Sequence, residues 1–352
     1  MGHYISILDP RLTTEWDTFV ESHPDATVFH TSDWARVILD SYDYRPLYHV
    51  SRDNTGTILA GVPLMRVDGR LTNRRLVGLP FSDLCSPLLN GPAASEDLLS
   101  AVRSAAADLG ATHVELRGPG AVPLEDSRFR GTSEFYQHII PIAATAEETA
   151  KGFHSSARRA IRKAEKEGIS VRLANELDDV REFYRLTVLT RKKHGLLPQP
   201  WRFFANIHRH MIANGAGHLL LAEYEGRPIA GDMLLQFRDQ MVYKFNASDP
   251  AFLHLRPNNI LLWEAIKLSV LRGCSTLDLG RCDEDNEGLR RFKLLWGSEE
   301  RRLRYYTHAS PGASPGGIMS SAPSRAVLSF VVKYAPPSAL RGIGAAVYHN
   351  FG

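Results

Sequence analysis

The sequence predicts an α+β fold built from two similar halves. Each half reads as helices, then antiparallel strands, then a helix and a closing strand, and this order occurs twice along 352 residues. The length also favours two domains, because a single hydrophobic core rarely grows beyond about 250 to 300 residues. The halves share no strong sequence identity, so the repeat is predicted from the order of elements alone.

The first half, residues 1–150, opens with helical signals and continues into strands. Ser32 and Asp33 are good N-terminal caps for a helix that contains Trp34. Apolar alternation and turn residues then predict two strands, a polar loop, a helix and a closing strand. In that order, these segments are residues 44–50, 57–66, 78–89, 95–109 and 112–117.

The second half, residues 151–310, repeats this order. Two helical patterns come first, three alternating apolar runs follow, and a further helix leads to a strand that begins at Thr276. These segments are residues 177–193, 201–214, 218–224, 229–237, 240–247 and 259–272. Gly, Ser and Pro enrichment predicts a flexible linker over residues 311–325. Residues 326–352 are expected to dock back on a domain as a helix or strand.

Composition indicates an ordinary globular protein, with 43% hydrophobic and 23% charged residues. The three cysteines lack CxxC spacing and the histidines are scattered, so we expect neither a disulfide framework nor a metal site. A net charge of +3 is too small to predict DNA as a partner. No apolar run approaches the roughly 18 residues of a membrane span, and the N-terminus lacks signal-peptide features. We therefore expect a cytoplasmic protein.

Charge is concentrated between residues 151 and 166. A helix here would place Ala157, Ile161 and Ala164 on a packing stripe and leave the basic side chains on the exposed face. The basic residues are Lys151, Arg158, Arg159, Arg162, Lys163 and Lys166. The pattern fits a solvated helix face or a surface that contacts a phosphorylated substrate, coenzyme A or tRNA, and both interpretations stay open.

The densest group of candidate chemical residues lies between residues 277 and 297. A strand ends at Gly280, an acidic turn follows, and a short helix then carries basic and aromatic side chains. Asp278 and Arg281 flank the strand end, where the carboxylate is a candidate proton acceptor; a buried ion pair explains the two residues equally well. We therefore predict a catalytic site at this strand end.

Three segments together resemble the FemAB-like branch of the GNAT acyltransferase superfamily, including members associated with exopolysaccharide systems. They are residues 189–204, 243–266 and 277–297, and the likeness extends over roughly residues 25–310. The resemblance implies two tandem GNAT-like domains, each a mixed, mostly antiparallel sheet flanked by helices, with the donor site in the second. It also implies transfer of an acyl or aminoacyl group to an amine. Founding members use aminoacyl-tRNA to extend peptidoglycan precursors, whereas many relatives are acetyltransferases.

The resemblance also suggests roles for individual residues. Phe292 and Lys293 match a Phe-Lys pair beside the donor site, where the cation would stabilise an oxyanion or hold a donor phosphate. Arg36 matches a basic position that meets a nucleotide-linked acceptor. Asp83 lies where the family often carries an acid that contacts the acceptor. Arg in a helix and Asp in a turn are also ordinary surface residues.

The donor class is left open by the segment before the helix at residue 259. GNAT enzymes bind the coenzyme A pyrophosphate through a Gly-rich turn at a helix start, but residues 255–259 contain no glycine. Arg256 would supply charge there, and Asn258 would cap the helix. Together with Arg158, Arg162 and Lys163, these residues are the predicted donor-binding set. The missing glycine disfavours coenzyme A.

Two further features have competing interpretations. Tyr243 and Tyr305 are candidates to orient an acyl carbonyl, although tyrosines of this kind are more often core residues. Residues 341–346 match the GNAT pyrophosphate pattern R-x-x-G-x-A, but only six residues follow them. We interpret them as a docked C-terminal helix with small packing residues.

The sequence thus predicts an acyltransferase that moves an aminoacyl or acyl group from aminoacyl-tRNA or acyl-CoA to an amine of a cell-wall, peptide or polysaccharide precursor. No tightly bound cofactor is expected, and contact with a membrane would be peripheral, through a lipid-linked substrate. One alternative is an acetyl-CoA-dependent N-acyltransferase that acts on an amino sugar in exopolysaccharide assembly. A second is a noncatalytic binding or scaffold protein with the same fold.

Overall fold

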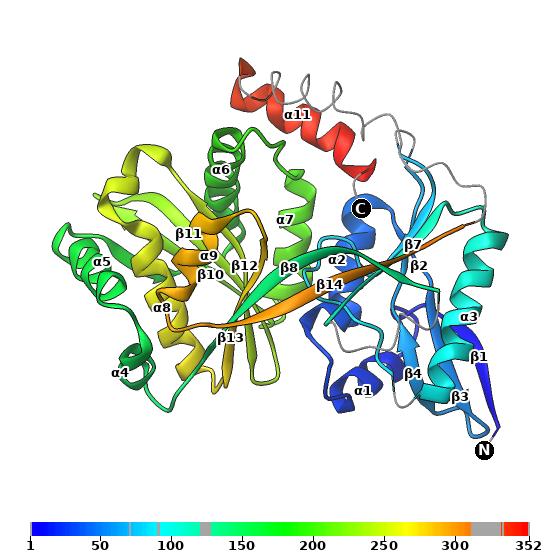
Figure 1. Ribbon diagram of the computed structural model, residues 1–352. Coiled ribbons are helices and arrows are strands. Elements are labelled where there is room, and N and C mark those ends of the chain that lie inside the picture. Colours follow the sequence, from blue (N-terminus) through cyan, green and yellow to red (C-terminus); the bar gives the residue numbers. More distant parts are fainter. Residues whose placement is uncertain are drawn as a thin grey trace. The chain divides into compact units, whose positions relative to one another are not determined.

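The computed structural model describes residues 2–69, 72–89, 92–119, 128–310, 332 and 334–350 (Figure 1). The chain forms two compact units. Unit 1 comprises the described residues of Met1–Glu134, Arg302–Val327 and Ala346–Gly352, and unit 2 those of Phe135–Arg301 and Leu328–Ala345. The chain passes from one unit to the other within strands β8 (Arg130–Pro141) and β14 (Glu299–Ala309) and again near the end of helix α11 (Pro337–Val347), whereas the sequence predicts a boundary at residue 150. The predicted linker lies outside the described residues.

Unit 1 contains a small antiparallel sheet and a larger mixed one. The small sheet has the order β1-β3-β4, with strands His3–Leu8, Tyr48–Asp53 and Ile58–Val62. The larger sheet runs β2-β5-β6-β7-β14, where β2, β5, β6 and β7 are Arg45–Pro46, Met65–Val67, Arg75–Val77 and His113–Pro119. The helices are α1 (Glu15–Ser22), α2 (Ser32–Tyr42) and α3 (Pro92–Asp108).

The predicted strand over residues 57–66 is two strands in the structure. β4 ends at Val62 and β5 begins at Met65, so Pro63 lies in the break. Proline cannot donate a ladder hydrogen bond, which explains why the strand stops there. The core of unit 1 forms where α3 packs on these strands, with Leu98 and Val102 fully buried.

Unit 2 is built on the strand order β8-β13-β12-β11-β10-β9. β9 to β13 are Ser170–Leu173, Gly217–Tyr224, Arg227–Phe237, Gln240–Ser248 and Thr276–Asp283. All neighbours pair antiparallel except β12 and β13, which are parallel. The helices are α4 (Ala146–Thr149), α5 (Ser155–Lys166), α6 (Leu177–Lys193), α7 (Trp201–Ile207), α8 (Pro257–Leu271), α9 (Glu287–Leu294) and α11 (Pro337–Val347).

Helices cover both faces of this sheet. Phe245 of β12 contacts Phe203 and Phe204 of α7, whereas the next residue, Asn246, reaches Asn258 of α8. Because successive side chains of a strand point to opposite faces, α7 and α8 lie on opposite sides. α5 packs beside α8, and their apolar residues share one core cluster with the sheet. This layer positions the candidate site.

Sequence patterns located most of these helices. The prediction for residues 177–193 coincides with α6, and the one for 259–272 overlaps α8 closely. The predicted helix over 201–214 is α only to Ile207 and continues as a π-helical turn over His208–Ile212. Among the described residues, no helix combines the length and apolar character that a bilayer span needs.

The C-terminal segment contains α11, which covers residues 341–346. α11 is helical through this stretch, and Gly344 is buried against Pro198. A Cβ atom added at Gly344 would lie 2.3 Å from the Pro198 carbonyl oxygen. The small residue is therefore explained by packing.

Replacing Gly344 with Ala is expected to weaken the docking of α11, since overpacking of this kind costs typically about 1 to 3 kcal/mol. Gly342→Ala is the matched control, because no atom lies within 4 Å of the added Cβ. That change should leave stability unchanged or raise it by about 0.5 to 1 kcal/mol. Amide hydrogen exchange over Pro337–Val347 measures the effect. Equal protection in the two variants would contradict the packing contact.

Candidate active site

A cavity of about 590 Å³ lies in unit 2 where α5, the start of α8 and α9 meet. Its wall combines cations with aromatic and amide side chains, namely Arg159, Lys163, Arg256, Asn258, Phe292 and Trp296. The volume falls within the range of small-molecule and cofactor sites, about 300 to 1,000 Å³. Four of these residues were predicted from sequence, and Arg159 and Trp296 were not. We call this cavity the donor pocket, after the predicted donor-binding residues that line it; that it binds a donor stays a prediction.

The start of α8 forms one side of the donor pocket. Arg256 is the N-terminal cap and takes a left-handed conformation with φ of 65°. Pro257 follows and has no N–H, and the N–H of Asn259 donates to the Arg256 carbonyl at 3.0 Å. Helix starts usually attract anions through free N–H groups. Here fewer are available, so the exposed Arg256 side chain supplies much of the positive charge.

A buried polar network supports the start of α8. Asn246 Nδ2 donates to Asp232 Oδ1 at 2.7 Å and to Asn258 Oδ1 at 3.4 Å. Asp232 is completely buried, and burial raises its pKa to about 7, although Asn246 and Tyr243 act in the opposite direction. Burial likewise raises the pKa of Tyr243 well above its usual value. Tyr243 therefore lies beside a core carboxyl that the sequence analysis missed.

Lys293 and Phe292 of α9 point to different places. Phe292 lines the donor pocket, with its ring 6.3 Å from that of Trp296. Lys293 is only 5% exposed, and its Nζ donates to the carbonyl oxygens of Gly280 at 2.8 Å and Arg281 at 3.0 Å. The ammonium thus ties α9 to the end of β13. Its predicted role toward an oxyanion remains a prediction.

β13 bends where Lys293 holds it. Its register with β8 shifts between Asp278 and Arg281, and Gly280 takes a φ of 71°, which favours glycine. Asp278 accepts hydrogen bonds from Gln137 Nε2 at 2.6 Å and from the Gly280 N–H at 2.8 Å. The Arg281 guanidinium lies 4.3 Å from the ring centre of Phe135. Asp278 and Arg281 therefore make separate contacts around one bend.

Charged residues surround Lys293 in unit 2. Arg290 forms two hydrogen bonds to Glu300, at 2.5 and 2.7 Å, and His138 Nε2 lies 3.2 Å from the same carboxylate. Burial is the main cause that lowers the pKa of His138, and the charge of Lys293 adds to it. Burial also raises the pKa of Cys282. His138 and Glu300 are far apart in sequence, so no spacing signal could have found this group.

The predicted donor-binding cations separate on the two flanks of α5. Lys163 lines the donor pocket together with Arg159. Arg158 and Arg162 instead line a second hollow on the other flank. Arg158 and Arg162 therefore lie outside the pocket that Lys163 lines, because residues one apart on a helix point about 100° apart. That all three contact the donor stays a prediction.

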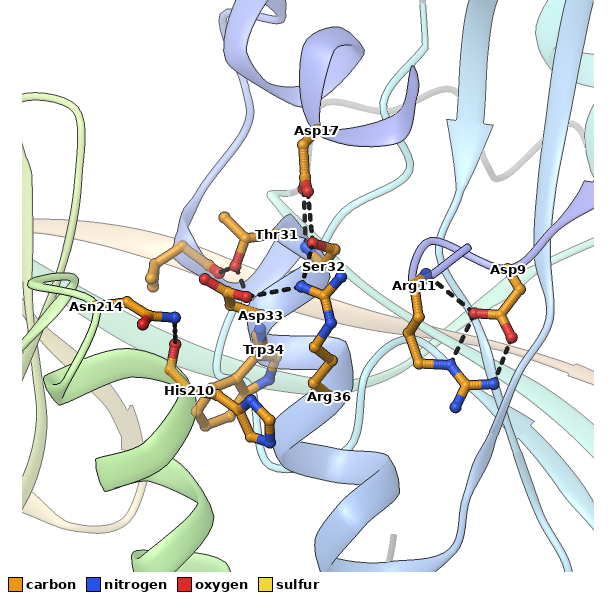
Figure 2. Close-up of polar contacts among 11 residues, drawn as sticks. Asp9, Arg11, Asp17, Thr31, Ser32, Asp33, Trp34, Arg36, His210 and Asn214 are labelled. Carbon is orange, nitrogen blue, oxygen red and sulfur yellow. Dashed lines mark hydrogen bonds and ion pairs between the residues drawn. The ribbon is translucent and has the colours of Figure 1, made fainter. Parts of the chain in front are cut away.

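Arg36 lies on α2 in unit 1 and is bonded within its own helix (Figure 2). Its Nη1 donates to Ser32 Oγ at 3.0 Å and to Asp33 Oδ1 at 2.8 Å, while Asp17 accepts from the N–H and the hydroxyl of Ser32. About a third of the Arg36 side chain is exposed. The first turn of α2 thus fixes the guanidinium without covering it.

Asp83 and Tyr305 are brought together in unit 1, but through the backbone. The Tyr305 hydroxyl donates to the Asp83 carbonyl oxygen at 2.8 Å. Arg117, which sequence reasoning missed, donates to the carbonyl of Ser82 at 2.9 Å and stacks 5.2 Å from the Tyr305 ring centre. Leu79 in the same loop has a positive φ of 35°, which is strained for a non-glycine residue. The loop is held rigidly by buried groups.

Comparison with known proteins finds similarity to GNAT-type transferases. Residues 151–300 match the model of the acetyltransferase (GNAT) domain. The chain is 22% identical to the Lipid II:glycine glycyltransferase of Staphylococcus epidermidis, over 80% of this chain and 87% of that protein.

Solved structures show the same fold. The crystal structure of FemX has a TM-score of 0.68 at 16% identity, and the match covers 88% of this chain and 98% of that one. A tandem GNAT protein from the clavulanic acid biosynthesis pathway has a TM-score of 0.54 at 11% identity, covering 90% and 100% of the two chains. The predicted α+β fold with tandem GNAT-like domains is confirmed. The chain contains a GNAT domain over residues 151–300, is an acyltransferase and resembles the FemAB-like branch of the GNAT superfamily.

Proposed function

We propose that this acyltransferase moves an aminoacyl group from aminoacyl-tRNA to an amine of a lipid-linked cell-wall precursor. The acceptor class is supported by the relative from Staphylococcus epidermidis, whose name specifies lipid II as acceptor and glycine as the transferred group. The donor class is supported by one observation in particular: the donor pocket offers side-chain cations where a coenzyme A site needs free backbone amides.

The start of α8 carries the donor argument. A pyrophosphate bound by a helix start needs several N–H groups and close backbone approach, which glycine permits. Pro257 removes one N–H, and the Asn259 N–H is already bonded. Arg159, Lys163 and Arg256 instead present long, flexible cations around the cavity. Such side chains suit the separated phosphodiesters of an RNA end.

The proposed reaction is direct aminolysis of an ester. The neutral acceptor amine attacks the ester carbonyl, the new C–N bond forms, and the tetrahedral intermediate carries an oxyanion. The C–O bond to the terminal ribose then breaks, and the ribose oxygen leaves as a hydroxyl with the proton that the amine loses. Asp278 is the proposed proton acceptor at the β13 bend. Lys293 would act by its positive charge and by fixing the Gly280–Arg281 backbone.

The test of donor class compares transfer from aminoacyl-tRNA with transfer from acetyl-CoA, using wild-type protein and Arg256→Ala. We expect transfer only from the charged tRNA, and a KM for tRNA at least several-fold higher in the variant, because one phosphate contact is lost. Thermal shift with uncharged tRNA and free coenzyme A provides an independent measure of binding. Saturable transfer from acetyl-CoA alone would overturn the tRNA proposal and favour the N-acetyltransferase alternative.

Lys293→Met is expected to lower kcat by about 100- to 1,000-fold, the usual loss when a group that stabilises an oxyanion is removed. The Gly280 and Arg281 carbonyls also lose a donor, which costs about 1 to 3 kcal/mol of stability. Unfolding and tRNA binding are therefore measured beside the rate. Lys193→Met, at an exposed position in the last turn of α6, makes the same chemical change as a control. A folded Lys293→Met protein with normal kcat would show that Lys293 has no catalytic role.

Asp232→Asn tests the network under the donor pocket through pH. The buried acid has a pKa of about 7, whereas an Asp in an unfolded chain ionises near about 4. Between these values the folded state holds one more proton, so the free energy of unfolding falls as pH rises. Across this pH range the free energy of unfolding should fall by at most about 4 kcal/mol.

We expect this fall for the wild type between pH 4 and pH 8, and a clearly flatter profile for Asp232→Asn, both measured by urea unfolding. The variant has no titrating group at this position, so the difference between the two profiles isolates the carboxyl. Parallel profiles would show that Asp232 does not titrate in this range.

A further inference from the structure

Helix α5 separates two hollows of unit 2. On one flank, Arg159 and Lys163 line the donor pocket. On the other flank, Arg158 and Arg162 line a groove of about 510 Å³, together with Lys151 and Trp263. We call this second hollow the outer groove. The donor pocket and the outer groove thus share one helix as their common wall.

The helix is held in place by its apolar side, which leaves the cations free to face outward. Ala157, Ile161 and Ala164 are buried in the core cluster that α5 shares with α8 and the sheet. All six basic residues of this segment, by contrast, are exposed. The basic face is therefore a fixed surface and not a flexible tail.

No close ion pair holds these cations within the described part of unit 2. Over residues 128–310, which the structure describes without a gap, none of the six forms an ion pair with a carboxylate within 4.0 Å. Arg158 Nη1 donates to the Ala150 carbonyl at 3.0 Å and Arg159 Nη1 to Ser155 Oγ at 3.1 Å, and both acceptors are neutral. Glu147 and Glu165 also line the outer groove, so its charge is positive but mixed.

The distance across α5 limits which anion can use both hollows. A helix with its side chains is about 10 to 12 Å wide. Coenzyme A concentrates its phosphates at one end of a small molecule, so a single hollow would be enough to hold them. A ligand that also reaches the outer groove must carry negative charge over a longer path. Nucleic acid has this property, since each nucleotide adds a phosphate.

We propose that the outer groove binds the phosphodiester backbone of the donor RNA beyond its aminoacylated end. Lys151, Arg158 and Arg162 contact phosphates, and the Trp263 ring beside them offers a surface on which a base or ribose packs. The inference rests on the proposed tRNA donor. It adds that binding of the RNA body and binding of the reacting end are separate tasks, assigned to opposite flanks of α5.

The test uses the full-length protein with two donors, a complete aminoacyl-tRNA and an aminoacylated RNA of only its last few nucleotides. In Arg158→Ala/Arg162→Ala, the KM for the complete tRNA should rise roughly 10-fold, and the slope of log affinity against log salt should fall by about 1 to 2. The KM for the short donor should stay within about twofold of the wild type, since that donor does not reach the outer groove.

Arg209→Ala/Arg272→Ala is the matched control, because both side chains are exposed in unit 2, line neither hollow and remove the same charge. Circular dichroism and thermal unfolding check that both double variants fold. The control should leave both donors unaffected. An equal rise in KM for the complete tRNA in the control would show that the effect depends only on net charge, and it would overturn the inference.

Other outcomes separate this inference from the proposed function. An equal rise in KM for both donors would show that Arg158 and Arg162 bind the reacting end of the RNA. An unchanged KM for the complete tRNA would show that the outer groove does not bind RNA. Loss of binding to vesicles of phosphatidylglycerol and phosphatidylcholine, with tRNA kinetics unchanged, would assign the groove to an anionic lipid surface. A wild type that uses the short donor as well as the complete tRNA overturns the inference alone. A wild type that discharges neither overturns the proposed function.

Discussion

The bond between the Lys293 ammonium and the carbonyls of Gly280 and Arg281 is the contact on which the site in unit 2 depends. A buried cation is costly unless oxygen atoms surround it, and the bend of β13 provides them. The same contact fixes the last turn of α9 against the strand. Because Phe292 adjoins Lys293, fixing the ammonium also sets the aromatic wall of the donor pocket. One buried charge thus couples the strand bend to the pocket.

The second constraint acts on α8. Asp232 and Asn246 hold Asn258 from beneath, while Pro257 and the bonded N–H of Asn259 leave the helix start short of free amides. A helix start of this kind attracts an anion less through its backbone than through neighbouring side chains. Side-chain cations adapt to phosphates at several positions, at the cost of stronger screening by salt. The chemistry of the pocket therefore favours a flexible polyanion over a compact pyrophosphate.

Local patterns predicted the elements well and the polar contacts poorly. The coincidence of the predicted helix with α6 follows from strong 3.6-residue periodicity, and the break at Pro63 was readable from proline chemistry but overlooked. The contact of His138 with Glu300 and the burial of Asp232 are set by strand register and tertiary packing. Sequence spacing predicts neither the His138–Glu300 contact nor the burial of Asp232. Family resemblance identified Phe292 and Lys293, but only the structure shows that their side chains point in different directions.

The two units use the same device at their candidate carboxylates. In unit 2, Lys293 binds backbone carbonyls beside the bend that contains Asp278. In unit 1, Arg117 binds the carbonyls of Ser82 and Leu79 in the loop that contains Asp83. In both places a cation binds backbone carbonyls near a candidate acid. The acids are themselves engaged: Asp278 accepts hydrogen bonds from Gln137 and from the Gly280 N–H, and, although burial opposes it, the charge of Asp83 helps to raise the pKa of Arg117. Contacts of this kind fix the position of each acid before substrate binds.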